Sequence, residues 1–165
     1  MPTKKMTLLA LFTTISLAVY AIESAIPPLI PIPGIKLGLA NIVTLILLEH
    51  YSLREALAVL LTRILLSTLL FGQALSLIYS LAGGIVSLFI MVFTMKLLRK
   101  KLSCLTGAMG GIAHNMGQLT VAFAITATPG VLSFLPFFLI SGILTGLFTG
   151  FCASAASKYL IPHLR

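Results

Sequence analysis

The chain has 165 residues, of which 59% are hydrophobic and 8% are charged, with a formal net charge of +8. A soluble domain carries about 25% charged residues, so this composition predicts an integral membrane protein rather than a soluble enzyme. There is no Asp, and the only carboxylates belong to Glu23, Glu49 and Glu55. Because metal-dependent phosphate chemistry needs clustered carboxylates, we expect no metal, no cofactor and no catalytic residues.

Six apolar segments predict an all-α protein with six transmembrane helices in one domain covering residues 1–165. The spans are expected at about residues 6–25, 34–50, 53–71, 73–98, 103–128 and 131–160. The first also resembles a signal peptide, but we expect a retained helix. Its small residues Ala10, Thr14 and Ala18 recur every four positions and form a narrow stripe against which another helix can pack.

A proline-rich loop follows the first span, with Pro27, Pro28, Pro31 and Pro33 between residues 25 and 36. Proline at this density excludes helix and favours extended backbone. Because the loop is also apolar, we expect it to fold back over the helix ends as a lid; the alternative is a stiff connector.

Polar residues interrupt the later spans. Arg63 lies about 15 Å from the start of its predicted helix, near mid-membrane, where an arginine has a function, forms a structural ion pair or extends its side chain to the membrane surface. Gly142, Gly146 and Gly150 form a ridge that predicts close helix packing, and Pro136 either kinks the last helix or marks a later start. The two cysteines are expected to be reduced, apolar residues.

The cations predict the orientation. With both termini in the cytoplasm, Lys36 is the lone cation on the outer side, whereas nine lie on the inner side: Lys4, Lys5, Arg54, Lys96, Arg99, Lys100, Lys101, Lys158 and Arg165. The positive-inside rule explains this charge, and no basic and aromatic face accompanies it, so we expect a lipid bilayer and no nucleic acid as partner.

The sequence GGIAHNMGQ, residues 110–118, is the strongest candidate site. In a helix, His114 and Gln118 lie one turn apart on one face, with Asn115 on its flank, and such a face is costly in lipid. Depths assigned from the topology place the intramembrane polar residues in the outer half, which predicts an outward-open, ligand-binding pocket. We expect it to be formed by Glu23, Lys36, Asn41, Arg63, His114, Asn115 and Gln118. The alternative is a network that only ties the helices together.

Four blocks carry a family resemblance: KLGLANIVTL (36–45), Arg63, SLAGGIVSLFIM (80–91) and GGIAHNMGQ (110–118). The chain resembles the membrane family called heptaprenyl diphosphate synthase component I, also the Gx transporter family. That family is similar to the S components of energy-coupling factor (ECF) vitamin importers. The resemblance implies a six-helix S-component-like bundle in the bacterial cell membrane, a loop capping an outward pocket, and a helix-one face that docks on a coupling subunit. Ala10, Thr14 and Ala18 stand where that face is expected.

Three functions remain open. The first is capture and transport of a small anionic or amphipathic, vitamin-like solute, by the protein alone or docked on an ECF-type transmembrane coupling subunit with ATPases. The second is a non-catalytic subunit of isoprenoid or quinone synthesis that associates with a prenyl diphosphate synthase; catalysis itself is not expected, because such enzymes use aspartate-rich motifs. The third is a membrane scaffold without a ligand site.

Overall fold

A computed structural model describes residues 3–25, 36–71, 74–98 and 102–159. Every regular element within these ranges is a helix and none is a strand, which confirms the predicted all-α class. The elements are α1 (Thr3–Ala25), α2 (Asn41–His50), α3 (Leu53–Phe71), α4 (Ala74–Leu97), α5 (Ser103–Thr126), the 3₁₀ helix η1 (Pro129–Phe134) and α6 (Leu135–Tyr159). The lid predicted from the proline-rich loop lies outside the described residues.

Three described stretches are long and apolar enough to cross a membrane: Thr3–Ala25, Ala74–Leu97 and Pro129–Tyr159. They support a multi-pass membrane protein. Pro136 lies in the first turn of α6, so the sixth segment is two elements and the proline follows the later helix start.

The second predicted helix is shorter than expected. We predicted it from residue 34, but Lys36–Ala40 is not helical and α2 has 10 residues. Gly38 has a φ of +81°, in the left-handed region that interrupts a right-handed helix. At 1.5 Å per residue, α2 is about 15 Å long, half of a bilayer core.

Although it is the shortest α-helix, α2 contacts each of the other five. Seven of its 10 residues are buried. Its Leu45 and Leu47 are fully buried in the larger apolar cluster, which also holds Phe12, Leu60 and Leu88 from α1, α3 and α4. The core of the molecule therefore surrounds α2.

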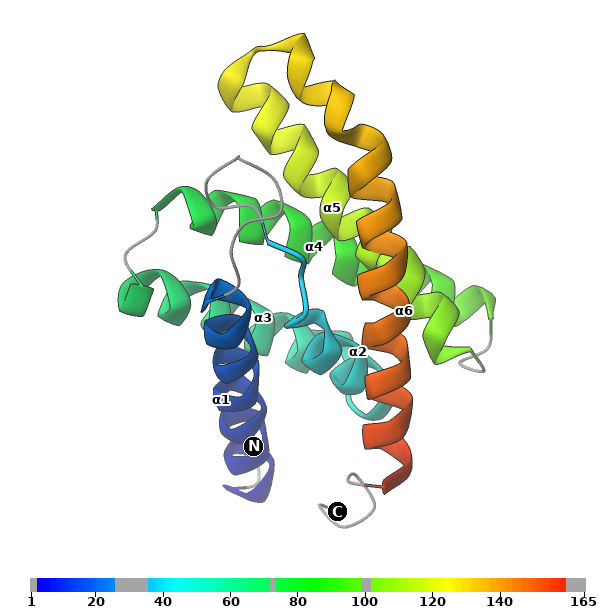
Figure 1. The fold of residues 1–165 in the computed structure, drawn as a ribbon. Coiled ribbons are helices and arrows are strands. Elements are labelled where there is room, and N and C mark those ends of the chain that lie inside the picture. Colours follow the sequence, from blue (N-terminus) through cyan, green and yellow to red (C-terminus); the bar gives the residue numbers. More distant parts are fainter. Residues whose placement is uncertain (1–2, 26–35, 72–73, 99–101, 160–165) are drawn as a thin grey trace.

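Helices α5 and α6 form an antiparallel hairpin whose backbones touch (Figure 1). A Cβ atom on Gly107 would meet the carbonyl oxygen of Gly146, and one on Gly111 would meet that of Gly142. Gly150 packs in the same way against the start of α5. The predicted packing role of the glycine ridge on α6 is confirmed, and its partner is a second set of glycines on α5.

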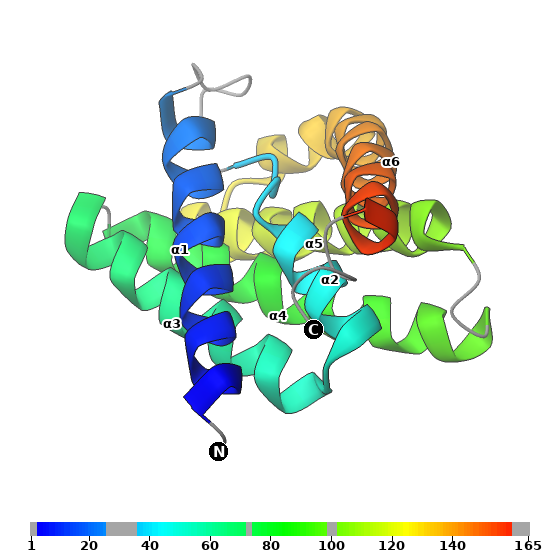
Figure 2. The same ribbon diagram turned by 90° about the horizontal axis from the view of Figure 1, so that it is seen from below.

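The helices are not parallel to one another. Figure 1 shows α3 and α4 running across the direction of α1 and α6, and Figure 2 shows α6 almost end-on. The start of α1 and the end of α6 lie at the same end of the molecule. In the described part of the chain, α1 packs on α3 and α2, and a side chain near its end also hydrogen-bonds α4.

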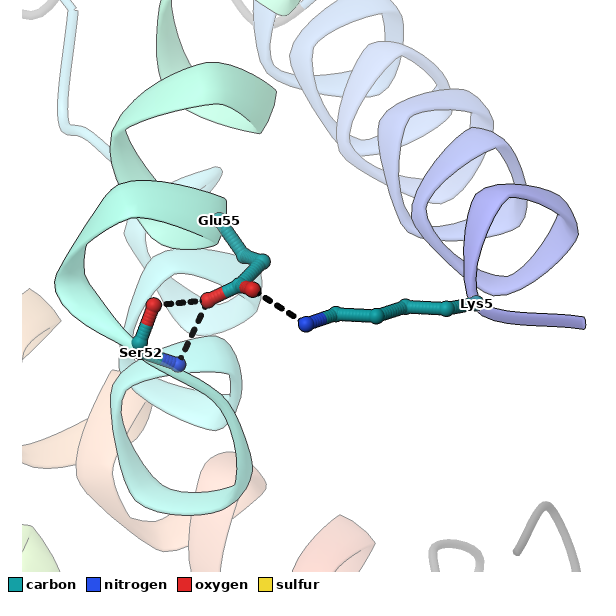
Figure 3. Close-up of polar contacts among 3 residues, drawn as sticks. All are labelled: Lys5, Ser52 and Glu55. Carbon is teal, nitrogen blue, oxygen red and sulfur yellow. Dashed lines mark hydrogen bonds and ion pairs between the residues drawn. The ribbon is translucent and has the colours of Figure 1, made fainter. Parts of the chain in front are cut away.

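The end of the molecule at which α1 starts carries two polar clusters. In the first, Lys5 of α1 pairs with Glu55 of α3, and Glu55 also accepts hydrogen bonds from Ser52 (Figure 3). In the second, Glu49 accepts hydrogen bonds from Ser103 at 2.5 Å and from Ser157 at 2.6 Å. These contacts bring together the starts of α1, α3 and α5 and the ends of α2 and α6. We call this the basal end.

Candidate functional site

The His114 imidazole lies between two glycines from different parts of the chain. A Cβ atom on Gly38 would come within 2.7 Å of Cδ2 of the ring, and one on Gly83 within 2.9 Å of Cε1. Any side chain at either position would displace the imidazole. His114 itself is buried. The non-helical Lys36–Ala40 segment therefore covers one side of the ring, and α4 covers the other.

Gln118 links this ring to the covering segment. Its Oε1 accepts a hydrogen bond from the backbone N–H of Lys36 at 3.4 Å, and its Nε2 lies 3.0 Å from Nε2 of His114. Because an amide nitrogen donates, Nε2 of His114 accepts, which places the proton of the neutral ring on Nδ1. The two residues predicted on one helix face thus form a single hydrogen-bonded unit.

The Glu23 side chain, near the end of α1, binds two successive backbone amides. Its Oε1 accepts from Gly38 N–H at 2.6 Å and its Oε2 from Leu39 N–H at 3.0 Å. The positive φ of Gly38 allows this pair of amides to point at one anion, as in an anion-binding nest. Glu23 is buried, so these bonds replace its hydration.

Arg63 is a buried cation near the middle of α3. It is 3% exposed, and its Nε has no hydrogen-bond partner. Glu23 lies within electrostatic range, but no carboxylate of the described residues is within ion-pair distance of the guanidinium. The Tyr20 ring lies 5.9 Å from Cζ. A buried arginine without an anion beside it is costly, so this side chain fits a site for an incoming anion.

The two asparagines differ. Asn41 begins α2 and donates through Nδ2 to Ser87 at 3.3 Å, while its buried Oδ1 has no partner. Asn115 points to α6 instead, where Nδ2 donates to the Phe138 carbonyl at 2.8 Å and to Ser141 at 2.9 Å. The structure therefore brings Asn41 to the site and places Asn115 in the α5–α6 contact. A ligand-binding role for Asn115 stays a prediction.

Lys36 contacts Tyr20 and Ser24 of α1, which were not among the predicted site residues. Its ammonium bonds to Ser24 and lies 3.5 Å from the centre of the Tyr20 ring. The Tyr20 hydroxyl in turn hydrogen-bonds Ser76 at 2.9 Å. The signal was helical spacing, because Tyr20, Glu23 and Ser24 share one face of α1.

The predicted docking stripe lies on the opposite side of α1 from the site. Ala10, Thr14 and Ala18 are exposed, and the Thr14 hydroxyl is bonded to the Ala10 carbonyl at 3.0 Å. No described helix covers them, since α1 packs on α3 and α2 through its other face. Cys104 and Cys152 are both free, as expected, with Cys104 exposed.

Comparison with protein families finds that residues 12–156 match the model of heptaprenyl diphosphate synthase component I. The chain belongs to the heptaprenyl diphosphate synthase component I family. This match includes every predicted site residue: Glu23, Lys36, Asn41, Arg63, His114, Asn115 and Gln118. Searches of the curated proteins and of the solved structures found no match. The family description names a synthase, and the described side chains contain no cluster of His, Cys, Asp and Glu that could hold a metal ion.

Proposed function

We propose that this family member is a membrane protein that binds and transports a small anionic or amphipathic solute, in the manner of an ECF S component. The observation that carries the proposal is the buried Arg63 guanidinium, which has no anion at bonding distance in the described chain. Asn41 Oδ1 and Arg63 Nε, both buried and unpartnered, add one acceptor and one donor. A ligand that carries an anionic group beside a hydrogen-bond donor would satisfy both atoms.

Charge balance supports an external anion. The chain has three acidic side chains, and each already accepts at least two hydrogen bonds: Glu23 from amides, Glu49 from hydroxyls, and Glu55 from Lys5 and Ser52. The candidate site holds two cations, Lys36 and Arg63, and one carboxylate, that of Glu23. A ligand group with one negative charge would neutralise the net charge of the candidate site.

The proposal includes a six-helix bundle in the bacterial cell membrane with the basal end in the cytoplasm, in which α2 crosses about half of the bilayer core. In this orientation the candidate site lies in the outer half of the membrane and receives solute from outside. The exposed stripe of Ala10, Thr14 and Ala18 is the surface we propose for an ECF-type transmembrane coupling subunit with its ATPases. The protein has no catalytic role in this proposal.

The test is native mass spectrometry of the protein extracted mildly from its own membrane. We expect a bound small anion in the wild type and its loss in both Arg63→Ala and His114→Ala, with insertion and monodispersity retained. Arg54→Ala is the matched control, because Arg54 is an exposed arginine at the start of the same helix. Retention of the solute in both site variants would refute the proposal.

The family description favours a second candidate, a non-catalytic subunit associated with a prenyl diphosphate synthase. The same extraction distinguishes the two. Co-purification of a soluble prenyl synthase, with no small molecule dependent on Arg63, would support the second candidate over the first.

A further inference from the structure

The Glu23 carboxylate has two possible binding partners: the backbone amides of Gly38 and Leu39, and the guanidinium of Arg63. In the structure it is bound to the Gly38 and Leu39 amides, and the Arg63 guanidinium lies 5.9 Å from the ring of Tyr20, one helical turn before Glu23, without forming an ion pair. As long as the carboxylate stays on the amides, the guanidinium remains available to a ligand. If the carboxylate turned to Arg63, the two amides would lose their acceptor.

The amides belong to the segment that covers His114. Gly38 lies against the ring, and the Lys36 N–H bonds to Gln118. Lys36 also bonds through its ammonium to Ser24 of α1. Loss of the Glu23 contacts would therefore loosen the cover over the ring and the attachment of the cover to α1.

Resting on the proposed function, we infer that Glu23 is a positioning residue that exchanges between the Gly38–Leu39 amides and Arg63. With an empty site, Glu23 can pair with Arg63, and the cover is released. An incoming anion takes Arg63, Glu23 returns to the amides, and Lys36–Ala40 closes over His114. Ligand binding and closure are thus linked through one carboxylate, and each favours the other.

The inference is tested by hydrogen–deuterium exchange of the purified protein after any co-purified solute has been removed by exhaustive dialysis, with fragmentation that resolves the Gly38 and Leu39 amides. Glu23→Ala removes the acceptor, and we expect exchange at both amides to accelerate about tenfold or more, as for loss of a charge-assisted hydrogen bond. Glu23→Gln keeps an acceptor oxygen and should restore most of the protection. Glu55→Gln, at the basal end of the molecule, is the matched control and should leave both amides unchanged.

Arg63 variants separate exchange between partners from a purely structural role of Glu23. Arg63→Gln removes the competing cation, so we expect the two amides to exchange more slowly than in the wild type, whereas Arg63→Lys should behave as the wild type. In the Glu23→Ala background, Arg63→Gln should have no further effect. Unchanged exchange in Glu23→Ala, or exchange that Arg63→Gln accelerates or leaves unchanged, would overturn the inference. A bound solute independent of Arg63 would refute the proposed function alone, because the exchange experiment uses no ligand.

Discussion

At the residue scale, the His114–Gln118 pair could be predicted because both residues lie on one helix and helical spacing alone brings them together. The direction of Asn115 could not be predicted, since it depends on where α6 packs. The partners of His114 come from residues 38 and 83, far apart in the sequence. Helical periodicity identifies the face of a side chain but not the element that meets it.

Gly38→Ala tests how tightly this site is built. The left-handed backbone costs a non-glycine residue about 1–2 kcal/mol, and the new methyl group would also press on the His114 ring. We expect a lower midpoint of thermal unfolding in detergent and loss of the co-purified solute. Gly130→Ala is the control, because a Cβ there meets its nearest atom at 3.7 Å and Gly130 has no positive φ. Equal behaviour of the two variants would contradict this account of Gly38.

At the scale of the elements, hydrophobic runs located all six α-helices but not the start of α2. The sequence from residue 36 to 40 is apolar apart from Lys36, so hydropathy continues the helix, whereas the Gly38 conformation and the Glu23 contacts end it. The glycine ridge of α6 was predicted from its regular spacing. Its partners on α5 are not predictable in this way: Gly111 falls within the predicted site stretch and Gly107 before it, and one helix does not reveal what packs on it.

Gly146→Leu tests the α5–α6 contact. A Cβ at Gly146 would meet the backbone of Gly107 and Ala108, which cannot move as a flexible side chain can. Overpacking costs about 1–3 kcal/mol, and we expect at least this loss of stability, seen as a lower unfolding midpoint. Leu144→Ala is the control on the same helix, since Leu144 is 62% exposed to the surroundings. A wild-type midpoint for Gly146→Leu would mean that the two helices can separate at little cost.

At the scale of the whole molecule, the distribution of cations predicts a topology that the polar contacts of the basal end agree with. The starts of α1, α3 and α5 meet the ends of α2 and α6 there. What the sequence did not reveal is that α3 and α4 run across α1 and α6 (Figure 1). Crossing directions depend on how helix surfaces interlock, and hydropathy contains no such information.

Single cysteines test the orientation in intact cells. In a background with Cys104 and Cys152 replaced by serine, a membrane-impermeant maleimide should label Thr128→Cys, between α5 and η1, but not Lys158→Cys or Arg54→Cys. All three native residues are exposed. Permeabilised cells should show labelling at all three positions. Labelling of Lys158→Cys in intact cells would contradict cytoplasmic termini.

The glycine contact between α5 and α6 also determines how the molecule would respond to force. Two helices whose backbones touch resist separation, whereas α1 is attached to α2, α3 and α4 through side chains and a few polar bonds. A pull on the amino terminus would peel α1 away first and leave the α5–α6 hairpin folded. The Glu23 hydrogen bonds connect α1 to the Lys36–Ala40 segment over His114. The same pull would therefore draw this segment away from the ring, and release a bound solute, before the other helices separate.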